Sequence, residues 1–339
     1  MSDSELQTQE VGSLKKPSWL VKTLMDKTSS EEEKECARND AALLNIMQME
    51  NSGMDIIYDG EARRVEMYEY SAKRINGMKF SGRVRSWDNK YYKKARCVDK
   101  VSYTGPYHLD EFKFIKQHTE KRLKVPITGA YTIADWSYNE YYQNKEDFVF
   151  DLAREVLHPL VRDLVAEGAT FIQIDEPAAT THPQEMKLVV DAFNETISGI
   201  DAKFGIHICY SGNNYMALHP TVLEMKNHQY TLEFANRDSW NLGTTAKERT
   251  GYSALDNFKE YNEKKEIGLG VIDVHLNDLE SAELVRDRIL YAVSVVGDPS
   301  LIQVNPDCGL RTRSREVSFK KLENMVKGTL LARERLGTF

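Results

Sequence analysis

Short apolar runs alternate with longer amphipathic segments along nearly the whole chain. Eight of the runs have the apolar, β-branched character of buried strands: residues 10–13, 54–58, 125–130, 170–174, 204–209, 229–234, 270–275 and 301–304. Between them, apolar residues recur every three to four positions over residues 29–52, 145–167, 184–198, 254–265, 278–296 and 318–336, which predicts helices. Strands that alternate with helices form parallel β/α units, so the pattern predicts an α/β protein with a closed (β/α)8 barrel.

Residues 79–107 do not fit a minimal β/α unit. Turn residues at Ser81-Gly82 and Asn89-Lys90 separate alternating aromatic residues, which predicts a hairpin inserted after the second strand. The whole chain, residues 1–339, is then expected to be one barrel domain, with residues 1–8 flexible. The acidic run at residues 31–35 is expected to begin an exposed helix, because acidic side chains favour the positive end of the helix dipole.

Composition narrows the class of protein. A length of 339 residues suits a single α/β barrel. The net charge of −7 and a pI near 5.7 disfavour a nucleic-acid partner, so the basic and aromatic run at residues 90–94 is interpreted as a solvated loop or a local anion-binding patch. A mean hydropathy of −0.53, no apolar run of membrane-spanning length and no secretory or transit signal predict a cytoplasmic protein without a membrane partner.

Two cysteines and a histidine suggest a metal site. His207 and Cys209 end one apolar run, and because strand side chains alternate with period two, both point to the same face. Cys308 and Glu233 follow or end other runs. Two thiolates, one imidazole and one carboxylate suit Zn²⁺, and ligands spread over three strands are typical of a catalytic site with an exchangeable position. The alternative is two buried, inert cysteines and a core histidine.

Polar residues gather where the predicted strands end, which is where barrel enzymes hold their active sites. These residues are Ser13, Glu61, Trp136, Asp175, Glu176, His207, Cys209, Glu233, His275, Asp307 and Cys308. Taken singly, some of these residues have a simpler explanation. Glu61 could be a carboxylate at a helix N-terminus, and residues 175–177 could be a helix cap followed by a turn. The whole set on one rim favours an enzyme.

Four stretches, residues 174–178, 207–210, 273–275 and 304–313, resemble the catalytic half of cobalamin-independent methionine synthase. The similarity extends in order to residues 11–13, 60–62, 96–98 and 135–137, so it covers nearly the whole chain. Longer enzymes of that family carry an additional N-terminal barrel. This chain resembles the short, single-barrel form known from archaea.

Carried over position by position, the resemblance implies transfer of a methyl group to the thiol of homocysteine, forming methionine. It implies four zinc ligands, His207, Cys209, Glu233 and Cys308. It implies binding of the amino-acid part of homocysteine by Val11, Ser13, Glu61 and Asp175. It implies contact of the methyl donor with Arg96, Cys97 and Trp136, and proton donation by His275. Trp136 would otherwise be interpreted as a core aromatic residue.

The chain departs from the family at two places that concern the methyl donor. Thr181 stands where folate-using enzymes carry a Glu that contacts the cofactor, and residues 236–250 lengthen the spacing between Cys209 and Cys308. The expected donor is therefore a methyltetrahydrofolate or a methylated corrinoid, the latter alone or on a corrinoid protein. Two alternatives are zinc-dependent alkyl transfer to a different thiol and a non-catalytic zinc protein with a closed metal site.

Overall fold

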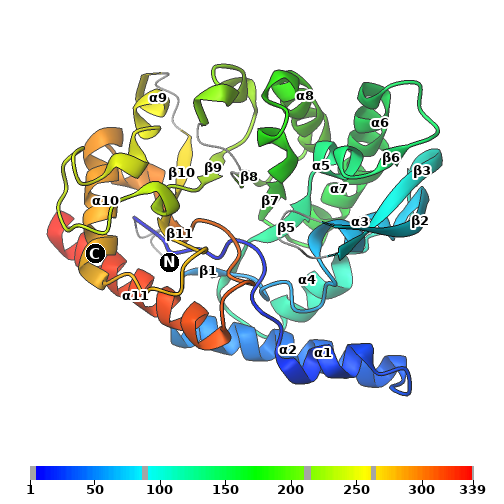
Figure 1. Cartoon of the computed structure of the whole chain (residues 1–339), viewed down its shortest axis with the longest axis horizontal. Coiled ribbons are helices and arrows are strands. Elements are labelled where there is room, and N and C mark those ends of the chain that lie inside the picture. Colours follow the sequence, from blue (N-terminus) through cyan, green and yellow to red (C-terminus); the bar gives the residue numbers. More distant parts are fainter. Residues whose placement is uncertain (1–4, 86–90, 210–214, 261–264, 338–339) are drawn as a thin grey trace. The chain divides into compact units, whose positions relative to one another are not determined.

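A computed structural model of the chain describes residues 5–85, 91–209, 215–260 and 265–337 (Figure 1). Its contacts divide the chain into two compact units. Unit 1 comprises residues 1–63, 115–124 and 229–339, and unit 2 comprises residues 64–114 and 125–228. Within the described ranges, no helix is both long and apolar enough to cross a membrane.

Parallel strands form the centre of unit 1. They are β1 (Ile56–Ile57), β4 (Arg122–Leu123), β9 (Gln229–Leu232), β10 (Glu266–Ile272) and β11 (Ile302–Pro306). β10 pairs in parallel with both β9 and β11, and β1 pairs in parallel with β4. Single bridges from Thr8 to Val304 and from Gln9 to Ile56 place the start of the chain between β11 and β1. The first predicted strand, residues 10–13, is therefore wrong: the chain pairs only through single bridges at residues 8 and 9, just before it.

A buried amide network joins the strands of unit 1. The Gln9 side-chain amide donates hydrogen bonds to Gln229 Oε1 at 3.0 Å and to Asn305 Oδ1 at 2.9 Å. Gly268 lies beside this network: a Cβ there would come within 2.8 Å of the Gln9 amide nitrogen. Buried amides need partners, so this network specifies which strands are neighbours.

Unit 1 also contains helices and short 3₁₀ turns. They are α1 (Ser18–Met25), α2 (Glu31–Asn51), α9 (Leu255–Glu260), α10 (Ala282–Val296) and α11 (Arg315–Leu336), with 3₁₀ turns η6 (Ala235–Arg237), η7 (Thr250–Tyr252) and η8 (Pro299–Leu301). α2 begins at a capping box between Ser30 and Glu33, which confirms the predicted acidic helix start. α10 and α11 pack side by side (Figure 1).

The parallel strands of unit 2 align the residues at their ends. They are β5 (Val125–Thr128), β7 (Phe171–Asp175) and β8 (Lys203–Ile208). β7 lies between the other two, and its last residue, Asp175, pairs with Thr128 on one side and His207 on the other. The register therefore places Asp175 and His207 next to each other at the carboxyl ends of neighbouring strands.

A second sheet in unit 2 contains the predicted hairpin. β2 (Ile75–Arg85) and β3 (Tyr91–Tyr103) pair in antiparallel fashion, and β6 (Tyr138–Asn139) adds to β3 in parallel. The hairpin begins at Ile75 rather than at residue 79. Residues 86–90 between the two strands, which include Lys90 of the basic and aromatic run, lie outside the described residues.

The helical segments of unit 2 follow the predicted pattern with one irregularity. They are α3 (Met67–Ala72), α5 (Ala130–Asp135), α6 (Lys145–Asp151), η1 (Leu152–Leu157), α7 (His158–Ala166), η2 (Pro177–Thr180), η3 (Pro183–Glu185), α8 (Met186–Ile197), η4 (Tyr215–Leu218) and η5 (Thr221–Glu224), while α4 (Leu109–Lys116) spans both units. The predicted helix 145–167 contains the π-helical turn η1. Pro159 has no N–H to donate to the helix. The residue before it, His158, donates its N–H to the Ala153 carbonyl, five residues earlier, which is the hydrogen bond of a π-helix.

The start of the chain was expected to be flexible over residues 1–8. Residues 1–4 lie outside the described residues. Leu6 is fully buried, and Thr8 donates to Asp55 Oδ2 from its backbone N at 2.8 Å and its hydroxyl at 2.9 Å. The expectation of a single barrel domain stays a prediction, because compact units of contact do not say what folds independently.

Candidate metal centre and active site

His207 and Cys209 lie together in unit 2. His207 is buried at the end of β8, and Cys209 follows the strand half-buried. The two side chains share a face, with Cys209 Sγ 2.9 Å from His207 Nε2. Zinc at ordinary bond lengths holds such a nitrogen and sulfur about 3.5 Å apart. The pair is therefore close to the spacing that a shared zinc ion requires.

Glu233 is the first residue after β9, which ends at Leu232 rather than at the predicted residue 234. The side chain is buried, and its Oε2 accepts a hydrogen bond from Asn236 Nδ2 at 3.1 Å. Arg237 Nη2 lies 3.7 Å from the same oxygen. Two residues of the following turn η6 therefore hold the Glu233 carboxylate.

Asp307 connects the segments that carry Glu233 and Cys308. Its buried carboxylate accepts hydrogen bonds from three consecutive backbone N–H groups, those of Phe234 at 2.9 Å, Ala235 at 3.0 Å and Asn236 at 2.7 Å. Burial raises the pKa of Asp307 to about 7, although the three N–H groups oppose this rise. Within unit 1, the loop after Glu233 is thereby bonded to the residue that precedes Cys308.

Glu61 has an unusual backbone conformation at the rim of unit 1. Its φ of +54° lies in the left-handed region, which residues other than glycine rarely adopt. Its N–H donates to Asp59 Oδ1 at 2.9 Å, and its carbonyl accepts from Lys16 Nζ at 3.1 Å. The nearest helix, α3, is capped by Glu66, so the interpretation of Glu61 as a helix N-terminal carboxylate is wrong.

Val11 and Ser13 lie close to Glu61 and to the segment after Cys308. A Cβ on Gly12 would be 3.7 Å from Glu61 Oε1, and a Cβ on Gly309 would be 2.7 Å from the Ser13 backbone N. Only a glycine at position 309 lets the two backbones come this close. Within unit 1, the structure therefore brings Ser13 beside Gly309, the residue that follows Cys308, and the backbone at Gly12 beside Glu61.

Asp175 and Glu176 end β7 but have different partners. The Asp175 carboxylate accepts from Gln173 Nε2 at 2.7 Å. Glu176 accepts from the backbone N–H groups of Tyr131 at 3.1 Å and Thr132 at 2.8 Å, and from the Thr132 hydroxyl at 2.6 Å. Burial raises the pKa of Glu176 to about 7. Glu176 is thus a cap, but it caps α5 and not the turn that follows it in sequence.

The predicted donor-binding residues are not all on one surface. Arg96 and Cys97 are neighbours on β3, so their side chains point to opposite faces. Cys97 is fully buried, its thiol donates to the Asp99 carbonyl at 3.3 Å, and burial raises its pKa to about 11. Arg96 pairs with Glu140 at 2.8 Å. The structure therefore brings Cys97 and Arg96 to different environments.

Trp136 lies at the C-terminal end of α5 and is half-buried. It packs against a small apolar cluster of Tyr68, Ala72 and Ala95, and its ring meets the Tyr68 ring edge-on with centroids 6.0 Å apart. These contacts are those of a core aromatic residue. Its contact with a methyl donor stays a prediction.

His275 lies beyond the end of β10, not within a strand as predicted, because β10 ends at Ile272. The residue is exposed, and its backbone N–H donates to Asp273 Oδ1 at 2.7 Å. Behind it, the buried Glu280 accepts from the Asp273 N–H at 2.9 Å and from Lys321 Nζ at 2.8 Å. Glu280 and Lys321 were not found from sequence, since no local pattern connects two residues on different elements.

Comparisons with known proteins show which family the chain belongs to. The family described as "Cobalamin-independent synthase, Catalytic domain" matches residues 8–330. The chain is 44% identical over 331 residues to a methionine synthase of Thermoplasma acidophilum, covering 94% of this chain and 96% of that protein. It is 42% identical over 336 residues to a methionine synthase of Pyrococcus furiosus, covering 98% and 94%.

The fold is similar to that of a solved B12-independent methionine synthase from Shewanella sp. W3-18-1 in complex with selenomethionine. The TM-score is 0.85 at 24% sequence identity, over 98% of this chain and 99% of that one. The similarity confirms the predicted α/β fold with parallel strands. The chain belongs to the cobalamin-independent methionine synthase family, and the methyltransferase predicted from its sequence is confirmed.

Proposed function

We propose that the protein transfers a methyl group to the thiol of L-homocysteine, forming L-methionine, with a zinc ion bound by His207, Cys209, Glu233 and Cys308. The observation that carries the proposal is the adjacent His207 and Cys209 pair, which presents a nitrogen and a sulfur ligand side by side at the carboxyl end of β8. Among the described residues, His207, Cys209 and Cys308 are the combination of side chains suited to a metal ion.

The donor set matches the chemistry that the reaction needs. A free alkyl thiol is mostly protonated at neutral pH, and only the thiolate is a good nucleophile. A bound zinc ion would supply the deprotonated form of the substrate sulfur. We propose that Glu233 is the exchangeable ligand, because Asn236 and Arg237 already lie where they can hold its carboxylate after release.

We propose that the substrate's amino-acid part binds to Val11, Ser13, Glu61 and Asp175. Ser13 and the backbone around Val11 are suited to its carboxylate, and Glu61 and Asp175 are suited to its ammonium group. A thiol without an amino group would leave these two carboxylates without a charge to pair. This feature favours homocysteine over the alternative of a different thiol.

In the methyl transfer, the new S–CH₃ bond forms as the bond between the methyl group and the donor breaks. If the donor is methyltetrahydrofolate, its leaving nitrogen takes a proton, and the exposed imidazole of His275 is the proposed donor of that proton. Asp273 holds the backbone of His275 and not its ring, so it acts by fixing where the residue lies.

Methyltetrahydrofolate is the proposed methyl donor, with Arg96, Cys97 and Trp136 as proposed contacts. Thr181, which replaces the Glu of folate-using enzymes, donates its hydroxyl to the Ala178 carbonyl at 2.7 Å. The Thr181 hydroxyl is therefore already used in a hydrogen bond within the local turn. Because Thr181 departs from the folate-using pattern, the test below compares the folate with a methylated corrinoid.

The test is methionine formation by the zinc-loaded protein with homocysteine, supplied in parallel with methyltetrahydrofolate polyglutamate and with methylcobalamin. We expect turnover with the folate; turnover with methylcobalamin alone would assign the corrinoid. Cys308→Ala should lose bound zinc and lower the rate by about 100-fold or more, by the usual size of ligand loss. Cys36→Ala, at an exposed cysteine of α2, is the matched control and should keep both. No methionine from either donor would favour a different thiol substrate.

A further inference from the structure

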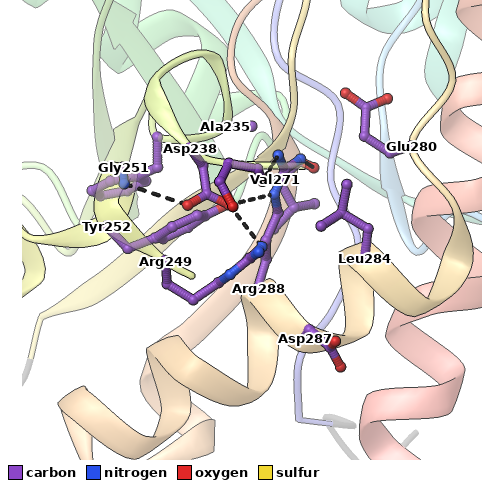
Figure 2. A network of polar contacts seen from close by, with 12 residues as sticks. Ala235, Asp238, Arg249, Gly251, Tyr252, Val271, Glu280, Leu284, Asp287 and Arg288 are labelled. Atoms are coloured by element: carbon purple, nitrogen blue, oxygen red, sulfur yellow. Dashed lines mark hydrogen bonds and ion pairs between the residues drawn. The ribbon is translucent and has the colours of Figure 1, made fainter. Parts of the chain in front are cut away.

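A network of buried charged side chains anchors the segment that follows Glu233, residues 235–254 (Figure 2). Asp238 Oδ2 accepts from Arg249 Nη1 at 2.7 Å and from Arg288 Nε at 3.0 Å, and all three side chains are fully buried. Arg288 also donates to the Val271 carbonyl of β10 at 2.9 Å. The segment is therefore anchored to α10 and to a central strand of unit 1.

Among the residues that the structure describes, Asp238 is the one carboxylate in direct contact with these two buried arginines. A buried unit charge is costly unless an opposite charge lies nearby. Asp307 supplies the second carboxylate, because it interacts electrostatically with Arg288. Arg288 therefore interacts electrostatically with Asp307 and Glu280 as well as with Asp238, and these acidic side chains offset its buried charge.

Asp307 also holds the start of the same segment. The N–H groups of residues 234, 235 and 236 begin the 3₁₀ turn η6, and N–H groups at such a start have no partner within the turn itself. Asp307 accepts all three. Gly270 on β10 leaves room for it: a Cβ there would lie 2.1 Å from Asp307 Oδ1.

The turn η6, held by Asp307, also holds the Glu233 side chain. Asn236 donates to Glu233 Oε2 at 3.1 Å, and Arg237 Nη1 donates to the Glu233 carbonyl at 3.0 Å. A path of contacts thus runs from the Asp307 carboxylate through the backbone of the turn to the Glu233 carboxylate. On its other side, Asp307 is bonded covalently to Cys308.

We propose that Asp307 is a positioning residue of the metal site: a single carboxylate sets the place of Glu233 through the turn η6 and of Cys308 through the chain. The inference rests on the proposed function, since it requires that these two residues bind zinc. It assigns Asp307 no contact with the metal or the substrate. Its effect is to hold two ligands from different strands in a fixed relation before the metal binds.

The test is the zinc affinity of Asp307→Asn, measured on the full chain by competition with a chromophoric chelator. The amide keeps the shape of the side chain, but its NH₂ group faces the N–H groups that the carboxylate accepted. We expect about 10- to 100-fold weaker zinc binding, the usual effect of losing a group that orients a ligand. Cobalt(II) substitution should show altered d–d absorption while the thiolate charge-transfer bands remain.

Asp298→Asn is the matched control, because Asp298 is exposed and caps the turn η8 through the Ser300 N–H in the same unit. Its zinc affinity should stay within about twofold of the wild type. A zinc affinity of Asp307→Asn equal to that of the control, with only the thermal stability of the zinc-free protein lowered, would overturn the proposal by making Asp307 merely structural.

A second variant covers the case in which Asp307→Asn does not fold. Asn236→Ala removes only the donor to Glu233 Oε2 and should weaken zinc binding by about threefold to tenfold, at or below the lower end of the range for such groups. Unchanged affinity in Asn236→Ala would then overturn the proposed path. If instead Cys308→Ala binds zinc as tightly as the wild type, the proposed function itself fails.

Discussion

Each of the two units holds a loop with a buried carboxylate, and the two carboxylates are built differently. Glu176 of unit 2 follows Asp175, and Asp307 of unit 1 precedes Cys308, so each is the neighbour of a proposed site residue. Each accepts backbone N–H groups from a segment that follows another strand. A carboxylate at one strand end can thus fix the loop of a second strand.

The two carboxylates differ in the element that each caps and in the glycine that leaves room for each side chain. Glu176 caps the helix α5 and gains the Thr132 hydroxyl, whereas Asp307 caps a 3₁₀ turn through backbone groups alone. A Cβ on Gly129, in the capped loop itself, would lie 2.0 Å from Glu176 Oε1. For Asp307 the required glycine is Gly270, on a third strand. A longer side chain and a shorter one do the same task because glycines at different places admit them.

The largest effect should come from filling the space beside these carboxylates. Gly270→Ala should lower the free energy of unfolding by about 3 kcal/mol or more, because its Cβ would also meet the Leu232 carbonyl at 2.7 Å, and backbone gives way poorly. Gly129→Ala should cost less, about 2 kcal/mol, since the three atoms nearest to its Cβ all belong to the Glu176 side chain and none to the backbone. Urea unfolding measures both.

Gly82→Ala is the control for that pair, because no atom lies within 4 Å of its Cβ position. It should change the free energy of unfolding by less than about 0.5 kcal/mol. Equal losses in Gly270→Ala and Gly129→Ala would show that the two carboxylates are equally free to move, against the difference described above.

A second effect concerns pH. The pKa of Glu176 rises on folding from 4.5 to about 7, so folding favours the protonated form. The associated stability is fully present below pH 4.5 and is lost as pH rises through 7. Between pH 5 and 8 the loss should be about 2.5 kcal/mol relative to Glu176→Gln, which cannot ionise. Urea unfolding of both proteins at the two pH values measures it, and an identical pH dependence would contradict the raised pKa.

The smallest effect should come from an exposed cap. Ser30 begins α2 and accepts the Glu33 N–H at 3.1 Å on the surface of unit 1. Ser30→Ala should lower the free energy of unfolding by about 1 kcal/mol, less than either glycine replacement beside a buried carboxylate. Thermal unfolding checks this, and a loss as large as that of Gly270→Ala would mean that burial adds nothing to such a cap.

The residues that sequence patterns located are those whose signal is local. The alternation of strands and helices, the acidic start of α2 and the shared face of His207 and Cys209 each depend on neighbours within a few positions. The opposite faces of Arg96 and Cys97 follow from the same period of two. The metal ligands and substrate contacts stay predictions, and they too were located by where strands end.

Tertiary structure alone decided which strand ends support one another. Glu176 meets the start of α5, Asp307 meets the turn after Glu233, and Lys321 meets Glu280, and in each pair the partners come from elements far apart in the chain. No local period predicts such pairs, because they depend on which strands become neighbours and on where a glycine leaves room. The sequence by itself determined the alternation of strands and helices and the chemistry of the residues near the strand ends, while long-range packing decided where those ends fall and how they are held.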